Sequence, residues 1–389
     1  MSYSVLMMPY SVGLGMTYHM GQTTAALLRR ATPLGVRVYV ACPAQEQVPG
    51  LWDLVRSCCP PERIFQLEPG KPDVAEVARR VLQTEERVVA HVHGMRQLLP
   101  LRAVRRESRG RLKTVFTVHS FRNATWRGVP YSLFVGHLLR KHVDYTHFLS
   151  PRSALEFVGS ERVLRGGRGG IMLQGLDWPE QPEAPDASSL DPQMLAALDD
   201  PHSFRFLYLA TVHAGKGHHW LIQALAPVLC RHPNARIIMP GRQDPRVVAN
   251  LRKLIAERGV ERQIVLPGLI SRHHVPWLIS RCNVGLVTSR SETFGYTILE
   301  PMAGGRPVIG TRRGVGEYLI MDYFTGIGFE YRDSAGLARA AEFMITHPAQ
   351  AAQMGENAAR LVRPLYTLDN AVTTYLRIYD SLWMDSATS

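Results

Sequence analysis

Two series of short apolar runs constrain the fold of this 389-residue chain more than any other feature, because each run alternates with a stretch of helical spacing. The first series predicts strands at Val5–Pro9, Val36–Ala41, Val88–Val92, Thr114–Val118 and Tyr145–Leu149. The second series restarts the rhythm and predicts strands at Phe204–Ala210, Arg236–Met239, Gln263–Leu266, Asn283–Thr288 and Pro307–Ile309. Strands that alternate with helices form βαβ units, so each series indicates a doubly wound parallel sheet.

The segment between the two series has the composition of a linker. Residues 178–200 hold four prolines among acids and serines, which is typical of a connection between domains, and we place the linker at 178–203. We therefore expect an α/β chain with Rossmann-like domains at 1–177 and 204–367. A final amphipathic helix at about 368–389 is expected to pack back on the first domain. Its apolar face holds Ala371, Tyr375, Ile378, Tyr379 and Leu382.

Composition argues against a membrane-spanning or secreted chain. Mean hydropathy is −0.09, and no run approaches the roughly 18 apolar residues that a spanning helix needs. The first ten residues lack the basic start and cleavage site of a secretory signal. Five scattered cysteines fit a reducing compartment better than a disulfide framework. We expect a cytoplasmic protein, associated at most with the inner face of the cytoplasmic membrane.

The net charge of +12 is concentrated in one segment. Residues 101–150 hold ten Lys and Arg but only Glu107 and Asp144 as acids, which gives 10 − 2 = +8. Such a block indicates an anionic partner, either a membrane surface or nucleic acid. Large apolar residues lie among the basic ones: Trp126, Tyr131, Phe134, Leu138 and Leu139. That mixture favours docking of residues 101–141 on anionic lipid, and the lack of a nucleic-acid-binding module makes nucleic acid the lesser alternative.

Chemically distinctive residues follow the predicted strands. In the first half, Gly13, Gly15, His93 and His119 come after strands; in the second half, Lys216, Gly241 and Glu292 do. Ligands of doubly wound sheets bind beyond the carboxyl ends of the strands. These residues therefore predict one central cleft that the two domains face.

The most informative motif is the pair Glu292 and Glu300, eight residues apart, within 291–308. A helix that opens near Phe294 or Gly295 would carry the second carboxylate. Its first amides, at the positive end of the helix dipole, would form an anion site between the two carboxylates. A nucleotide sugar, with an anionic middle and hydroxyl-rich ends, suits such a site.

These motifs resemble those of a GT-B glycosyltransferase of glycosyltransferase family 4, a family of retaining enzymes that use nucleotide-sugar donors. The likeness covers essentially the whole chain and is strongest over Gln263–Gly316. Weaker likenesses lie at Thr117–Ser120, Gln174–Asp177 and Gly355–Ala358. The resemblance implies a hexosyl transfer to a hydroxyl of a glycan or a lipid-linked acceptor, in the assembly of surface polysaccharide or lipopolysaccharide.

The resemblance also implies roles for the residues that match its motifs. Glu300 would accept hydrogen bonds from the ribose hydroxyls, and Glu292 would contact the transferred sugar. Backbone amides would hold that sugar and the distal phosphate, at Phe294, Gly295, Tyr296 and Thr297.

Further roles follow for groups on other loops. Lys216 would neutralise the diphosphate leaving group, and His119 would lie against the donor sugar. Gly15 would approach the phosphates, while Gly241 and Gly268 would line the nucleotide pocket. The implied mechanism is substitution with retention, in which the donor phosphate takes the acceptor proton. Because the sequence contains no D-x-D motif and no C-x-x-C pair, we expect neither a metal nor a cofactor.

The sequence departs from the family pattern in two places. Thr211 stands where the family has an arginine that grips the diphosphate; Arg242 or His213 could replace that arginine. The first loop reads Gly13-Leu14-Gly15 instead of having adjacent glycines. These departures leave open a changed donor or reduced activity, and Thr211 in particular leaves open a basic binding protein without turnover. A GT-B phosphorylase or epimerase is the alternative among enzymes. His91 and His93 share a strand face, as two ligands of a metal would. No acidic or cysteine ligand lies nearby in the sequence, which favours packing or acceptor contact over a metal pair.

Overall fold

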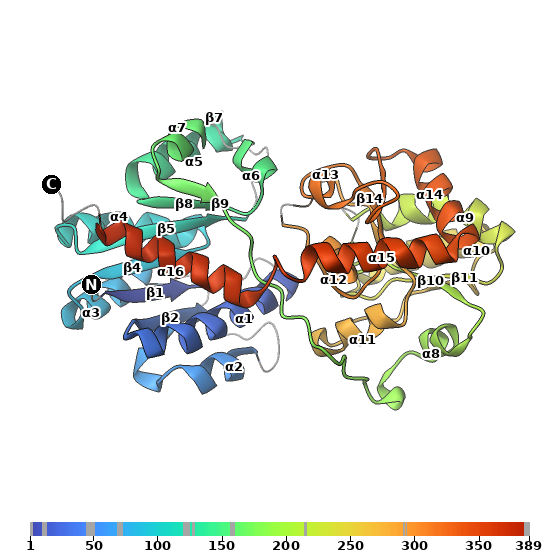
Figure 1. Cartoon of the computed structure of the whole chain (residues 1–389), viewed down its shortest axis with the longest axis horizontal. Helices are drawn as coiled ribbons and strands as arrows, with labels where there is room; N and C mark the ends of the chain where they lie inside the picture. Colours follow the sequence, from blue (N-terminus) through green and yellow to red (C-terminus); the bar gives the residue numbers. More distant parts are fainter. Residues whose placement is uncertain are drawn as a thin grey trace. The chain divides into compact units, whose positions relative to one another are not determined.

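The structure, a computed structural model, describes residues 3–9, 14–43, 51–67, 73–119, 125–126, 129–155, 160–213, 216–290, 292 and 294–384. The chain divides into two compact units (Figure 1). The first unit combines 1–177 with 366–389, and the second spans 178–365. Both are Rossmann-like, as the alternation of strands and helices predicts.

A seven-stranded parallel sheet forms the centre of the first unit, in the order β3-β2-β1-β4-β5-β8-β9. Its strands are β1 (Ser4–Met8), β2 (Arg37–Pro43), β3 (Ile64–Leu67), β4 (Val88–Val92), β5 (Leu112–Val118), β8 (Tyr145–Phe148) and β9 (Gly169–Ile171). Its helices are α1 (Leu14–Ala31), α2 (Leu51–Cys58), α3 (Val74–Thr84), α4 (Met95–Glu107), α5 (Tyr131–His142), α6 (Pro151–Leu155), α7 (Ser160–Arg165) and α16 (Leu368–Met384). A small hairpin pairs β6 (Thr125–Trp126) with β7 (Val129–Pro130).

Side chains of β1 alternate between two apolar layers, because successive residues of a strand point to opposite faces. Leu6 and Met8 pack with α3 and α4 on one face. Val5 and Met7 pack with α1, α2 and α16 on the other. Six buried residues of α16 complete the second layer: Val372, Tyr375, Leu376, Ile378, Tyr379 and Trp383. The predicted return of the last helix to the first unit is confirmed.

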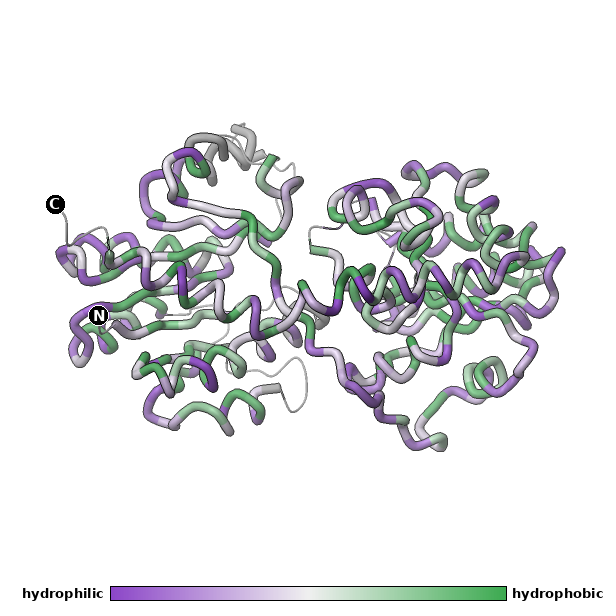
Figure 2. Tube along the Cα trace, in the orientation of Figure 1, coloured by the Kyte–Doolittle hydropathy of each residue, from purple (hydrophilic) through white to green (hydrophobic). Residues whose placement is uncertain are grey.

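The second unit contains a six-stranded parallel sheet in the order β12-β11-β10-β13-β14-β15. Its strands are β10 (Phe204–Leu207), β11 (Ala235–Ile238), β12 (Ile264–Val265), β13 (Val284–Val287), β14 (Val308–Thr311) and β15 (Gly326–Phe329). Its helices are α8 (Pro192–Asp199), α9 (His218–Arg231), α10 (Pro245–Glu257), α11 (Val275–Ser280), α12 (Tyr296–Ala303), α13 (Gly316–Leu319), α14 (Ser334–Thr346) and α15 (Pro348–Val362). In Figure 2, α15 alternates between hydrophobic and hydrophilic residues along its length, as a helix with one buried face should.

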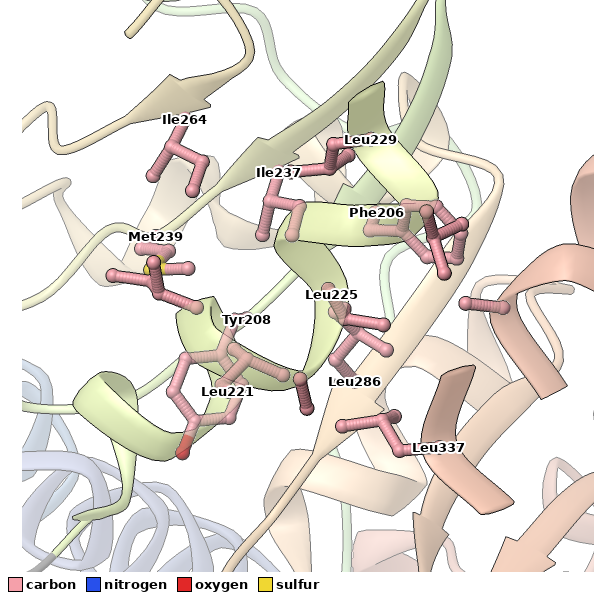
Figure 3. Close-up of a cluster of buried hydrophobic side chains, with 14 of the residues drawn as sticks. Phe206, Tyr208, Leu221, Leu225, Leu229, Ile237, Met239, Ile264, Leu286 and Leu337 are labelled. Atoms are coloured by element: carbon pink, nitrogen blue, oxygen red, sulfur yellow. The ribbon is translucent and has the colours of Figure 1, made fainter. Parts of the chain in front are cut away.

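Apolar layers cover both faces of this second sheet. Phe206 and Tyr208 join the layer formed by α9, α10 and α14 (Figure 3). Leu207 faces the other layer, where Met194 and Leu198 of α8 pack with α11. Residues 178–203, which composition suggested as a linker, thus belong to the second unit, because α8 buries its apolar side against the sheet.

No helix in the described part of the chain is long and apolar enough to cross a membrane.

Candidate active site

Strand order identifies where a ligand should bind in the second unit. The chain runs outward from β10 to β11 and β12 on one side, and from β13 to β14 and β15 on the other. β10 and β13 are adjacent and parallel, so their carboxyl ends form the topological switch point, the usual ligand position in such sheets. Lys216 lies in the loop that follows β10, and Glu292 lies in the loop that follows β13.

These two predicted residues come together at the switch point. The Nζ atom of Lys216 lies 3.8 Å from Oε1 of Glu292, and their side chains are 34% and 15% exposed. That distance is too long for a hydrogen bond. Among the described residues, Glu292 Oε1 has no hydrogen-bond partner although it is buried. Both charged groups therefore keep hydrogen-bonding capacity for a ligand.

The backbone of Lys216 is anchored by two groups that sequence reasoning missed. Tyr208 follows β10 and donates its hydroxyl to the carbonyl oxygen of Lys216. Thr288, just after β13, lies 2.8 Å from the same Tyr208 hydroxyl and donates more weakly to Lys216 O at 3.4 Å. Figure 3 shows the Tyr208 ring in the apolar layer with its oxygen pointing away from the labelled aliphatic side chains. Burial raises the pKa of the Tyr208 phenol, which keeps it a donor.

The helix expected to form the anion site is α12, and it opens where predicted. Gly295 is its N-cap with φ +80°, and Ile298 and Leu299 donate the first intrahelical bonds to Gly295 O. Helix-opening amides such as those of Tyr296 and Thr297 point out along the helix axis. The hydroxyl oxygen of Thr297 is buried with no hydrogen-bond partner among the described residues.

A close backbone contact fixes the Glu292 loop. Val315 N donates to Glu292 O at 3.0 Å, and Gly314 forms an isolated parallel bridge with Glu292. A Cβ on Gly314 would lie 2.1 Å from Glu292 O, and its φ of +65° favours glycine. Sequence reasoning did not single out Gly314, although the glycine pair Gly314 and Gly316 after a strand was a usable signal.

Glu300 is the fifth residue of α12 and its side chain is almost fully buried. Its Oε1 accepts a hydrogen bond from Arg272, whose side chain is also mostly buried. Arg272 begins a short 3-10 helix, Arg272–His274. This partner could not be found from the sequence, because 28 residues separate the two side chains.

The predicted glycines Gly241 and Gly268 meet directly after β11 and β12. Gly241 N donates to Gly268 O at 2.8 Å. A Cβ on Gly241 would lie 2.1 Å from the carbonyl oxygen of Ala210, so only glycine fits between these loops. The loops therefore approach closely by backbone contact alone.

A pocket of about 510 Å³ adjoins this contact. Its lining includes Thr211, which stands where the resemblance predicts an arginine, and both residues suggested as replacements for that arginine. The lining residues are Thr211, Val212, His213, Arg242, Gln243, Asp244, Pro245 and Arg246. Val212 N donates to Arg242 O at 2.8 Å, so the exposed Arg242 guanidinium and Thr211 belong to one pocket.

In the first unit, the predicted residues have different outcomes. His119 lies at the carboxyl end of β5 and contacts His93, which follows β4, through a ring-nitrogen distance of 2.8 Å. Gly15 is the second residue of α1, so the expected glycine loop is helical at this position. Gly13 lies outside the described residues.

The basic segment 101–141 is only partly available to a partner. Arg105 contacts Asp144 at 2.6 Å. Arg111 donates to carbonyl oxygens at the end of α3, including Leu82 O at 2.6 Å. Leu138 and Leu139 are buried in the first unit, so the expectation that they would meet lipid is wrong. Trp126, Tyr131 and Phe134 have side chains outside the described ones.

An exposed face of α4 remains. Arg102 and Arg106 are exposed and four residues apart, with Leu99 exposed on the same side. Arg109 is exposed just beyond the helix. This face is smaller than the whole basic segment, but it keeps the combination of cationic and apolar groups.

Comparison with known proteins agrees with this geometry. Residues 198–361, almost the whole second unit, match the family described as glycosyl transferases group 1. The chain is 31% identical over 173 residues to alpha-D-kanosaminyltransferase of Streptomyces kanamyceticus, which is 44% of each chain. It is 28% identical over 261 residues to the lipopolysaccharide core biosynthesis mannosyltransferase LpcC of Rhizobium leguminosarum bv. viciae, covering 65% of this chain and 72% of that one. The second unit is therefore a glycosyltransferase group 1 domain, although the match spans less than half of the first relative.

Solved structures extend the likeness to the whole fold. HepE of Anabaena, solved in complex with UDP and glucose, covers 97% of this chain and 99% of its own at 17% identity, with a TM-score of 0.76. At that identity the likeness concerns the fold. The chain has the GT-B fold, as the sequence predicted.

Proposed function

We propose that the chain is a retaining, metal-independent glycosyltransferase. It moves a sugar from a UDP- or GDP-sugar to a hydroxyl of a glycan or lipid-linked acceptor, in surface polysaccharide or lipopolysaccharide assembly. The observation that carries the proposal is the arrangement at the switch point. There, Lys216, Glu292 and the N-terminus of α12 offer a cation, a carboxylate and helix-opening amides together.

The charges at this point suit a nucleotide sugar. The Lys216 ammonium would neutralise the diphosphate as the sugar–phosphate bond breaks, because fixed charge in a partly dry site stabilises the departing anion strongly. The amides of α12 would bind the distal phosphate. Glu292 Oε1, which has no hydrogen bond within the described residues, would accept a hydroxyl of the transferred sugar.

Donor-binding proteins among the similar structures support the choice of substrate. HepE of Anabaena was solved with UDP-glucose, and LpcC is a mannosyltransferase of lipopolysaccharide core biosynthesis.

We propose that the Glu300 carboxylate accepts hydrogen bonds from the ribose hydroxyls of the donor, while Arg272 pairs with the other side of that carboxylate. A guanidinium against a buried carboxylate offsets the cost of burying that charge.

Arg242 is proposed to supply the cation that Thr211 lacks. The two residues line one pocket, and the guanidinium is exposed there. The guanidinium of Arg242 is a planar fork of donors, which suits a diphosphate better than the single imidazole ring of His213 does.

Nucleotide release with a panel of UDP- and GDP-sugars tests the proposal, and Glu300→Gln is the decisive variant. The wild-type protein should hydrolyse or transfer at least one donor. Glu300→Gln should lower that rate at least tenfold, because a neutral amide binds the ribose hydroxyls more weakly and leaves Arg272 without its anionic partner.

The matched control is Glu257→Gln, an exposed carboxylate on α10 that pairs with Lys253 at 3.9 Å. It should leave the rate within twofold. Turnover that requires inorganic phosphate would identify a phosphorylase. Inversion of configuration at a carbon of the donor sugar, without transfer, would identify an epimerase. If the wild type binds a donor but never turns it over, the chain is a binding protein with the same fold.

The proposed acceptor lies at a membrane surface, and the exposed face of α4 is the proposed contact. Reversing three charges together, Arg102→Glu, Arg106→Glu and Arg109→Glu, should release the protein from vesicles rich in anionic lipid. Each basic residue near such a surface contributes about 1 kcal/mol, so partitioning should fall by a factor on the order of 100 or more. Vesicle co-sedimentation measures it.

The control carries the same charge change on the second unit, at three exposed arginines in and after α10: Arg252→Glu, Arg258→Glu and Arg262→Glu. It should sediment with the vesicles nearly as well as the wild type. Equal release by both triple variants would mean that net charge, and not the α4 face, governs binding.

A further inference from the structure

Four buried histidines lie within the first sheet or at its carboxyl edge, and they form two hydrogen-bonded groups. The first group is closed. His147 Nε2 lies 3.1 Å from Met172 O, and its Nδ1 lies 2.9 Å from Thr117 Oγ1. His91 Nε2 is 2.7 Å from the same hydroxyl, and its Nδ1 is 2.6 Å from the Tyr379 hydroxyl.

The proton positions in this closed group follow from the contact at one end, between His147 and the carbonyl oxygen of Met172. A carbonyl oxygen only accepts, so His147 Nε2 donates to Met172 and His147 Nδ1 must accept from Thr117. The Thr117 oxygen then accepts from His91 Nε2, and His91 Nδ1 accepts from Tyr379. Every polar atom in the group has a partner, so these contacts serve the fold by tying α16 to the sheet.

The second group is open. His93 Nδ1 and His119 Nε2 share one hydrogen bond of 2.8 Å, and the two residues are only 4% and 7% exposed. Their outer nitrogens, His93 Nε2 and His119 Nδ1, have no hydrogen-bond partner among the described residues. Buried polar atoms are usually satisfied, so two orphans on one pair indicate a ligand at this edge of the sheet.

Neutral rings make the two orphan nitrogens interdependent. Burial lowers the pKa of His119 to about 3 and that of His93 well below its usual value. Each ring therefore holds one proton at neutral pH. If His93 donates across the shared bond, His119 Nδ1 is a donor; if His119 donates, its Nδ1 is an acceptor.

We propose that His93 is a positioning residue that sets which nitrogen of His119 carries the proton. It thereby fixes whether His119 Nδ1 donates to, or accepts from, a hydroxyl of the substrate at this edge of the first sheet. The ligand in this statement rests on the proposed function, whereas the coupling between the two rings does not.

The coupling is tested without any ligand. NMR of ¹⁵N-histidine-labelled protein distinguishes protonated from unprotonated ring nitrogens, and His119→Ala assigns the His119 signals. We expect a single neutral tautomer of His119 in the wild type and a changed tautomer population in His93→Leu. His93→Asn, whose amide replaces Nδ1, should restore the wild-type signals. Unchanged His119 signals in His93→Leu would overturn the proposal.

A double-mutant cycle tests the consequence for turnover, with UDP-glucose and GDP-mannose as probes. His93→Leu should lower kcat/KM at least tenfold, and His93→Asn should recover most of that loss. If His93 acts through His119, the variant with both His93→Leu and His119→Ala should match His119→Ala alone within twofold. If the losses of the two single variants multiply in the double variant, His93 acts independently of His119 and the proposal is overturned.

Thr117→Val is the matched control. Thr117 lies on β5, two residues before His119, and its replacement by valine breaks the closed group with little change of shape. It should lower the Tm, and any loss of activity should multiply with that of His119→Ala. If the wild type uses no nucleotide sugar, the proposed function fails while the NMR result still decides the coupling.

Discussion

Replacing Lys216 with alanine should lower kcat/KM at least tenfold, which corresponds to about 1.4 kcal/mol or more of lost transition-state stabilisation. The ammonium lies at the switch point beside Glu292 and is proposed to meet the departing diphosphate. The structure makes this variant easy to interpret, because Tyr208 and Thr288 hold the backbone carbonyl of Lys216 and not its side chain. The loop should keep its position in the variant, so steady-state nucleotide release reports the missing charge.

Lys253→Ala is the control, since Lys253 is an exposed lysine of the same unit whose ion pair is on the surface. Its kcat/KM and its Tm should both equal those of the wild type. The Tm of Lys216→Ala should also change little. An unaltered rate in Lys216→Ala would remove this residue from the site.

Gly314→Ala should damage both stability and activity. The new Cβ would meet Glu292 O at 2.1 Å, and the residue would be held at a positive φ that costs about 1–2 kcal/mol. Relief of the clash requires Glu292 to move. Since a displacement near 1 Å can lower a rate on the order of a hundredfold, kcat/KM should fall by about that factor. Nucleotide release and denaturant unfolding measure the two effects.

Gly259→Ala separates the two causes. Gly259 has a φ of +66°, close to that of Gly314, but nothing lies within 4 Å of its added Cβ. This variant should lose only about 1 kcal/mol of unfolding free energy and keep its activity. If both variants behave alike, the contact of Gly314 with Glu292 has no role in the site.

The strands could be predicted because they are buried on both faces. Val88–Val92 was located at its true bounds, since an uninterrupted apolar run has a clear beginning and end. β15 was missed because its sequence, Gly326-Ile327-Gly328-Phe329, is half glycine and has weak strand preference. Its pairing with β14 comes from the fold and not from local preference.

Candidate site residues could be proposed only where a residue has a local motif. Glu292 and Glu300 were proposed from their spacing and from the glycine between them, and Lys216 from its place after a strand. Arg272 and Tyr208 were not found, because their partners come from other loops or from the backbone. The charge count likewise overestimated how many basic residues of 101–141 are available to a partner. It does not reveal that Arg111 donates to carbonyl oxygens at the end of α3.

The path of the chain sets an order for folding. One apolar layer of the first unit lacks Tyr375, Tyr379 and Trp383 until α16 is in place, yet α16 follows the entire second unit in the sequence. During synthesis, the glycosyltransferase group 1 domain can therefore complete its core while the first unit still exposes an apolar face. The imidazole of His91, which contacts Tyr379 of α16 in the folded chain, is exposed there too. Nascent chains that stall between the two would present that face to chaperones.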